Sequence, residues 1–307
     1  MDLKRTLRHG AIAAHATLAR RRPEDAVVLS CDPRSGSTWL SELLGDGLNA
    51  ATIWEPFHLG EVPQVRAFGF GWREYIPADA DWPEAEALIR RILAGRVVNA
   101  WTTSANRTTD FLTADRLLVK CCRANAFLPW MARRIDFTSR PIHFLRHPFA
   151  IVASQLKMGI FSGEGLRDAL LKGRHAARLA DQVDYILGLE SDEERIVAMW
   201  CRTHLPCLTD PKRGELWFTM HYERLMVDPQ AEVTRLFEAW RRPVPDGMLD
   251  RVRNPSRMTQ DNSLETDPMA QIAKWQSRFP DSKQRAMLAV LSHFGICVYG
   301  QDPLPAT

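Results

Sequence analysis

The sequence predicts an α/β fold with three layers, in which a central, mostly parallel sheet is flanked by helices. Short apolar segments typical of strands alternate along the chain with segments of helical periodicity. This alternation is expected when helices connect parallel strands and cover both faces of the sheet. The expected strands cover residues 26–31, 51–54, 117–122, 141–146 and 215–222.

Length and composition fit one large domain. The chain has 307 residues, of which 45% are hydrophobic, enough to bury a sizeable core. The 40 basic and 37 acidic residues nearly balance, so a net charge of +3 gives no general field for binding nucleic acid. The six cysteines have neither metal-site spacing nor the pattern of a secreted disulfide framework. No apolar run approaches the about 18 residues of a membrane span, and we expect a cytoplasmic protein.

The N-terminal residues 1–25 are expected to form a basic helix, followed by a single domain over 26–300 and a tail over 301–307. Apolar residues of the first segment fall near one side of such a helix, among them Leu3 and Ile12. One interpretation is a helix that contacts a membrane surface. The interpretation that we favour is a helix packed on the domain.

The first motif is AVVLSCDPRSGSTWLSELL, over residues 26–44. It joins an apolar strand to a loop of small residues and then to an amphipathic helix that begins near Thr38. Backbone N–H groups of such a loop converge on an oxyanion, and the helix adds the positive end of its dipole. The spacing of a Walker A motif is absent, so hydrolysis of ATP or GTP is not expected. A serine-rich turn that only caps the helix is the alternative.

The second motif is PIHFLRHPFAIVASQLK, over residues 141–157. It reads as a strand that leads into a helix beginning near Pro148, since proline suits the first helical turn. Arg146 ends the strand and Ser154 lies on the helix. The planar guanidinium of arginine suits a phosphate group, and the serine supplies a hydroxyl beside it.

The two motifs together resemble those of sulfotransferases that use 3′-phosphoadenosine-5′-phosphosulfate (PAPS). The stretch from Pro33 to Trp39 is similar to the loop that binds the 5′-phosphosulfate, and Arg146, Pro148 and Ser154 stand at the spacing of the family's second element. The resemblance implies a P-loop-like fold, PAPS as co-substrate and no metal. It also implies that the co-substrate is bound by Arg34, Ser35, Gly36, Ser37, Thr38, Trp39, Arg146 and Ser154.

The resemblance continues to about residue 299. The run HYERL at 221–225, followed by Asp228 and Pro229, looks like a late family segment in which Tyr222 borders the adenine. Ser256 and Arg257 resemble the loop that closes over the 3′-phosphate, although the family's Arg-Lys-Gly form is missing. The alternatives are a tyrosine that only ends a core strand and two ordinary surface residues.

Sulfuryl transfer from PAPS to a hydroxyl builds negative charge on the departing phosphate oxygen, much as phosphoryl transfer does. Cations and loop N–H groups placed there stabilise that charge. The resemblance therefore places Arg34 against the leaving oxygen, where many members of the family carry a lysine. Because a guanidinium holds oxygens in a planar fork, we expect Arg34 to grip the group differently from a lysine.

A base must also take the proton of the acceptor. The histidine of small-phenol and steroid sulfotransferases is missing, since residues 120–123 read KCCR. Carbohydrate-directed relatives tend to carry a Glu-Pro pair, which resembles Glu55-Pro56 here. We expect Glu55 to be the base, with a pKa raised by partial burial. His58 is the second candidate, and in the alternative interpretation Glu55 only pairs with Arg34 or another cation.

The expected function is transfer of the sulfuryl group of PAPS to a hydroxyl of a sugar-containing molecule, a lipid or a glycan. Residues 57–82, rich in glycine, proline and aromatic side chains, are interpreted as a lid over the acceptor. Other possibilities are a phenol or small-alcohol sulfotransferase that uses His58, a module that binds PAP or PAPS without transfer, and more distantly a P-loop kinase. Partners are small molecules or glycans, with peripheral membrane contact left open and no nucleic acid.

Overall fold

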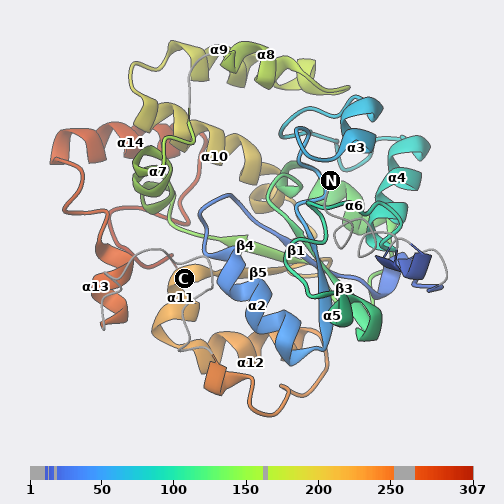
Figure 1. Cartoon of the computed structure of the whole chain (residues 1–307). Coiled ribbons are helices and arrows are strands. Elements are labelled where there is room, and N and C mark those ends of the chain that lie inside the picture. Colours follow the sequence, from blue (N-terminus) through green and yellow to red (C-terminus); the bar gives the residue numbers. More distant parts are fainter. Residues whose placement is uncertain (1–10, 13, 17–18, 162–164, 252–266, 307) are drawn as a thin grey trace.

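The computed structural model describes residues 11–12, 14–16, 19–161, 165–251 and 267–306 (Figure 1). Five strands form one sheet in the order β2-β3-β1-β4-β5, and every neighbouring pair is parallel. The strands are β1 Val27–Ser30, β2 Ala50–Trp54, β3 Arg116–Cys121, β4 Ile142–Leu145 and β5 Phe218–His221. Each strand lies inside an expected segment or extends beyond it by one residue. The predicted α/β fold with a parallel sheet is therefore confirmed.

Strand β1 occupies the centre of the sheet. All four of its residues are buried, and it pairs with β3 on one side and with β4 on the other. Because the strands are parallel, the segments that follow them leave from one common edge. The loop of the first motif follows β1, and Arg146 of the second motif follows β4, so these parts of the two motifs are neighbours at that edge.

The helices cover both faces of the sheet and extend beyond its edge (Figure 1). Apolar side chains of α2 and α12 pack with Val27 and Leu29 on one face. Side chains of α4 and α6 pack with Val28 on the other face. A third apolar cluster joins α7, α9, α10 and α14 around Leu145. The helices are α2 Ser37–Gly47, α3 Pro63–Phe68, α4 Pro83–Leu93, α5 Thr108–Thr113, α6 Leu128–Arg134, α7 Pro148–Lys157, α8 Leu166–Leu171, α9 Ala180–Gly188, α10 Asp192–Thr209, α11 Tyr222–Val227, α12 Pro229–Ala239, α13 Pro268–Ala273 and α14 Asp281–His293, with short 3₁₀ turns at Pro23–Asp25, Asn125–Phe127, Ala176–Leu179 and Leu249–Arg251.

The described part of the N-terminal segment packs on the domain. Ile12 and Ala16 are 1% and 2% exposed and belong to the apolar cluster on the α4 side of the sheet. Arg21 donates hydrogen bonds to the carbonyl groups of Phe111 and Ala114. Leu3 lies outside the described residues. Among the described helices, none is both long and apolar enough to cross a membrane.

Candidate functional site

The loop between β1 and α2 has a backbone suited to an anion. Arg34 and Gly36 both adopt left-handed backbone angles, with φ of 70° and 82°. Ser35, which lies between them, has a negative φ. A backbone that alternates in this way turns successive N–H groups toward one point. Helix α2 then begins at Ser37, one residue before the expected start, and no side chain of the described residues caps it. The first N–H groups of α2 therefore lie next to the loop and have no side-chain cap among the described residues.

Gly36 also allows a close approach from another part of the chain. A Cβ atom at this position would lie 2.6 Å from two ring carbons of Tyr222, the first residue of α11. The Tyr222 ring meets Trp39 edge-on, with ring centroids 6.3 Å apart. The structure thus places Tyr222, which the resemblance sets beside the adenine, next to Trp39 and to the loop.

Two arginines meet at this loop. Arg34 donates from Nε to the hydroxyl oxygen of Ser154 at 2.9 Å, across the entrance of the loop. Arg146 donates from Nη1 to the carbonyl oxygen of Arg34 at 2.8 Å. The Arg146 guanidinium also lies 4.4 Å from the centre of the Tyr222 ring. Four residues expected from three separate motifs are therefore in contact.

The arginine pair carries a local excess of positive charge. Within the described part of the chain, neither Arg34 nor Arg146 forms an ion pair with a carboxylate. Burial and the neighbouring charge of Arg146 lower the pKa of Arg34. The Nε atom of Arg146 is buried and has no hydrogen-bond partner among the described residues. A phosphate group would satisfy that donor and relieve the repulsion between the two guanidinium groups.

Ser256 and Arg257, expected to close over the 3′-phosphate, lie outside the described residues. Their assignment stays a prediction.

Glu55 lies directly after β2 with a left-handed backbone, φ 40°. Its N–H continues the pairing with β3 by bonding to the Lys120 carbonyl at 2.9 Å. Its carboxylate contacts Lys120 Nζ at 3.2 Å and Arg123 Nη1 at 2.7 Å, and it accepts from the Cys122 thiol at 3.2 Å. The Lys120 ammonium also sits 3.9 Å from the Trp54 ring centre. The cations that bind Glu55 are therefore Lys120 on β3 and Arg123 in the segment after β3, and not Arg34.

The expected rise in the pKa of Glu55 is wrong. Burial alone would raise the pKa, but the charges of Lys120 and Arg123 outweigh it and lower the pKa to about 2. The carboxylate is therefore ionised at neutral pH and is held by two cations. It accepts hydrogen bonds well but is only weakly basic.

His58 lies one turn after Glu55, and its N–H bonds to the Glu55 carbonyl at 3.1 Å. The ring packs against Trp72 and Trp101, with centroid distances of 5.1 and 5.0 Å. Burial, followed by the charge of Arg123, lowers the pKa of His58 below its usual 6.5. Its Nδ1 atom is buried and unpartnered among the described residues. The imidazole is therefore neutral at pH 7.

Sequence reasoning missed a second carboxylate at the start of the loop. Asp32 is 1% exposed and contacts Arg73 Nη1 through Oδ1 and His204 Nε2 through Oδ2, both at 2.8 Å. Arg73 also donates to the Thr203 hydroxyl at 2.9 Å. Burial would raise the pKa of Asp32, but Arg73 and His204 lower it to about 2. The partners of Asp32 lie 41 and 172 residues away, and no local pattern signals them.

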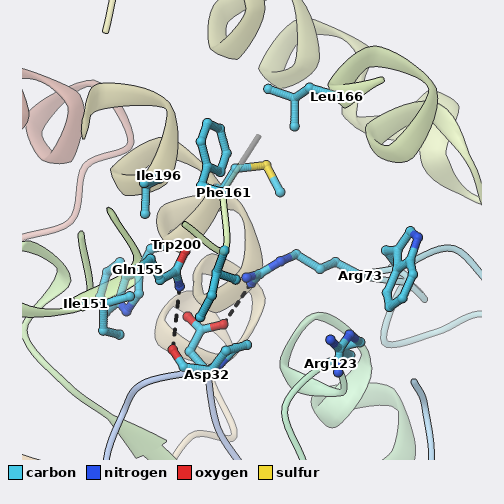
Figure 2. A pocket seen from close by; sticks show the side chains of 13 residues that line it. Asp32, Arg73, Arg123, Ile151, Gln155, Phe161, Leu166, Ile196 and Trp200 are labelled. Carbon is cyan, nitrogen blue, oxygen red and sulfur yellow. Dashed lines mark hydrogen bonds and ion pairs between the residues drawn. The ribbon is translucent and has the colours of Figure 1, made fainter. Parts of the chain in front are cut away.

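A cavity of about 200 Å³ opens beside Asp32 and Pro33, as Figure 2 shows. It lies between the loop, α7, α8 and α10. Arg73 reaches the cavity from the segment interpreted as a lid and Arg123 from the end of β3. The amide of Gln155 donates to the Pro33 carbonyl at 3.5 Å and forms part of its wall.

Glu74 holds in place the segment that carries two lining residues of this cavity, Trp72 and Arg73. It is 2% exposed and accepts from the backbone N–H of Gly71 at 2.6 Å and of Arg174 at 3.2 Å. Burial, more than its hydrogen bonds, sets its charge state and raises the pKa of Glu74 to about 6. A Cβ atom at Gly173 would lie 2.4 Å from a Glu74 carboxylate oxygen. The segment 71–74 is thereby held tightly against residues 172–174, which follow α8.

Three of the solved structures to which this chain is similar are sulfotransferases or sulfotransferase domains. One is the sulfotransferase domain of the Synechococcus PCC 7002 olefin synthase, which is 18% identical over 90% of this chain and 96% of that domain, with a TM-score of 0.47. The sulfotransferase domain of the curacin biosynthetic pathway is 20% identical over 90% of this chain and 99% of that domain, with a TM-score of 0.46. A sulfotransferase of Mycobacterium avium is 16% identical over 97% of this chain and 83% of that protein, with a TM-score of 0.42. In fold, the chain is similar to sulfotransferase domains. No protein-family model and no curated protein sequence matches it.

Proposed function

We propose that this protein transfers the sulfuryl group of PAPS to a hydroxyl group of an acceptor. One observation carries the proposal. Two guanidinium groups, of Arg34 and Arg146, meet at an uncapped helix N-terminus and have no carboxylate partner in the described part of the chain. This is an arrangement for phosphate-type anions, and it combines with aromatic side chains that suit a nucleotide base.

In this proposal the two motifs divide the nucleotide between them. Arg146 and Ser154 bind the 3′-phosphate, and Tyr222 and Trp39 border the adenine. The Ser154 hydroxyl accepts from Arg34 in the structure and keeps its own O–H for a phosphate oxygen. The loop of Ser35, Gly36, Ser37 and Thr38 surrounds the phosphosulfate. The N–H of Ser35 donates to the Asp32 carbonyl at 3.2 Å, so the backbone N–H groups of Gly36, Ser37 and Thr38 bind the group. Ser256 and Arg257 remain proposed contacts to the 3′-phosphate.

Catalysis follows from where these charges lie. PAPS supplies an activated sulfuryl group, and the protein stabilises the charge that builds on the departing phosphate oxygen. Arg34 provides that stabilisation together with the dipole of α2. Its pKa is lowered, but a guanidinium remains protonated at neutral pH, so Arg34 acts as a fixed cation. The proposed chemistry uses these groups where other transferases use a metal ion.

We retain Glu55 as the proposed acceptor of the proton from the substrate hydroxyl. Its carboxylate is ionised and lies at the same sheet edge as Arg34. In a loose transition state the bond from the acceptor oxygen to sulfur is little formed, so a weakly basic carboxylate that orients the hydroxyl suffices. His58 is the second candidate because its imidazole is neutral and its Nδ1 atom is unpartnered among the described residues.

The test of the proposed function is calorimetric titration with 3′-phosphoadenosine-5′-phosphate (PAP), the product of transfer, beside 5′-AMP, ATP and NADP. We expect binding that is selective for PAP. Arg146→Ala should weaken PAP by about 10- to 100-fold, because a charge-assisted hydrogen bond contributes roughly 1.5–3 kcal/mol, and it should leave 5′-AMP nearly unchanged. Arg285→Ala, an exposed arginine on α14, is the matched control.

Two outcomes would contradict the proposal. Equal losses of affinity for PAP and for 5′-AMP in Arg146→Ala would show that Arg146 does not bind the 3′-phosphate. Absence of any preference for PAP in the wild type would overturn the function. Selective PAP binding without transfer of radiolabelled sulfate to any hydroxyl would instead favour a binding module, for which the double ion pairing of Glu55 is the supporting observation.

A further inference from the structure

The cavity beside the loop is mainly apolar. Only four of the 13 residues that line it are polar, namely Asp32, Arg73, Arg123 and Gln155. The remaining lining comes largely from aliphatic and aromatic side chains of α7 and α10 and from the segment after α7. Its floor is fully buried, with Ile151, Trp200 and Ile196 between 1% and 3% exposed.

The charged and amide side chains of the cavity are already engaged with other protein groups, whereas the indole N–H of Trp200 has no partner among the described residues. Both carboxylate oxygens of Asp32 are bonded, one to Arg73 and one to His204. Arg123 is paired with Glu55, and the amide of Gln155 bonds to a backbone carbonyl. A bare sugar would bury several hydroxyl groups that find few free partners here. Each unsatisfied hydroxyl costs about 1–3 kcal/mol, so the cavity disfavours such a ligand.

The apolar surface continues outward from the floor. Trp72 and Ile160 line the cavity and are 37% and 51% exposed. Met158, two residues before Ile160, is 50% exposed, and Leu171 at the end of α8 is 41% exposed. Four of the seven large hydrophobic side chains exposed among the described residues therefore belong to segments that form or flank this cavity. Exposed apolar side chains gathered at the mouth of a pocket are typical of a ligand-binding surface.

We propose that the acceptor is an amphiphile, a hydroxyl-bearing molecule whose aliphatic chain lies in this cavity and leaves along the rim of Trp72, Met158 and Ile160. The inference rests on the proposed function, since it names the substrate class of the same site. The chain enters between α7 and α10, and the hydroxyl lies at the end formed by Asp32 and Pro33, the residues that precede Arg34 in the loop. Among sugar-containing molecules, lipids and glycans, the lining selects those that carry a lipid-like chain.

Chain length is the measurable consequence. Each methylene transferred from water into an apolar site contributes about 0.8 kcal/mol, which is about fourfold in kcat/KM. With PAPS as donor, the series ethanol, 1-butanol, 1-hexanol and 1-octanol should therefore show a steep rise in kcat/KM. Octyl glucoside should be sulfated far better than glucose. Phenol should fall near the short alcohols, because a single ring buries less apolar area than an octyl chain.

A matched pair of surface variants tests the location. Ile160→Ser removes apolar area at the rim from a side chain that is half exposed, so the fold is expected to be retained. It should lower kcat/KM for 1-octanol by about 3- to 10-fold and leave ethanol unchanged. Leu112→Ser, on α5 and 37% exposed, is the control and should alter neither substrate.

The outcomes separate the inference from the function on which it rests. PAP binding by the wild type combined with a flat chain-length series, or with glucose preferred over octyl glucoside, would overturn the amphiphile alone. An equal effect of Ile160→Ser on ethanol and 1-octanol would overturn the position of the chain. Loss of PAP selectivity would overturn the proposed function itself, and with it the role of the cavity as an acceptor site.

Discussion

Glu55 offers the sharpest test of the electrostatics of the site. Glu55→Gln should lower the free energy of unfolding at pH 7 by about 3 kcal/mol. The side chain is 14% exposed and binds Lys120, which is only 2% exposed, as well as Arg123. Removing the carboxylate leaves the buried ammonium without its partner, and breaking a buried pair on one side costs about 3–5 kcal/mol. The pKa gives a similar figure, since a fall from 4.5 to about 2 corresponds to roughly 3 kcal/mol.

The dependence on pH has a definite sign. The folded pKa of Glu55 lies below the unfolded value of 4.5. Its stabilising contribution is therefore complete above pH 4.5 and is lost as the pH falls toward 2. The difference between wild type and Glu55→Gln should consequently be about 0.8 kcal/mol smaller at pH 4 than at pH 7.

The assay is urea unfolding of wild type and variants at the two pH values. Glu86→Gln is the control, because Glu86 pairs with Arg90 within α4 in a half-exposed position, where such a pair contributes about 0.3–0.5 kcal/mol. The double variant Glu55→Gln/Lys120→Met should recover part of the loss, since it removes the orphaned charge. A Glu55→Gln protein within about 0.5 kcal/mol of wild type at pH 7 would refute the reasoning that Glu55 compensates a buried cation.

Glu55→Gln should also cut sulfuryl transfer by roughly 10²- to 10⁴-fold while PAP affinity stays close to wild type, and full activity would move the role of base to His58 or to solvent. With Glu55 as base, kcat should show no acid limb between pH 7 and 5, since its pKa is about 2; a limb in this range that disappears in His58→Gln would assign the base to His58. Gly36→Ala should abolish PAP binding, because the φ of 82° is strained for alanine and its Cβ would lie 2.6 Å from Tyr222; calorimetry showing wild-type affinity would contradict this. The folded pKa of Glu74, about 6, lies above the unfolded value of 4.5. The free energy of unfolding of the wild type, measured relative to Glu74→Gln, should therefore fall by about 2 kcal/mol as the pH rises from 4 to 8. An increase over this range would contradict a raised pKa for Glu74.

The sequence was sufficient for the sheet and for the meeting of the two motifs at one edge of it. Apolar runs bounded by turn residues predicted all five strands, and parallel pairing alone implied that the segments after β1 and β4 meet at one edge. The contact between Arg34 and Ser154, 120 residues apart, follows from that geometry. Short motifs at strand ends are predictable because the sheet fixes where they lie.

The acceptor side was less accessible from sequence. The error on the pKa of Glu55 arose because burial was considered without the register that sets Trp54 opposite Lys120. A lysine within the apolar run LLVKCC was a usable signal, since a buried ammonium requires a partner. The pairing of Asp32 with Arg73 and His204 had no comparable signal, because each partner lies on a separate element and tertiary packing alone brings them together.

The pairing of charged groups differs between the two sides of the site. On the cavity side both carboxylates are paired. Asp32 binds Arg73 and His204, and Glu55 binds Lys120 and Arg123. On the loop side the guanidinium groups of Arg34 and Arg146 have no carboxylate partner among the described residues. In the proposed function, an anionic donor would gain charge-assisted hydrogen bonds at this loop. Each cation that lines the cavity is paired with a carboxylate, so in the proposed function the unpaired guanidinium groups attract the anionic donor to the loop and the apolar cavity is left to the acceptor chain.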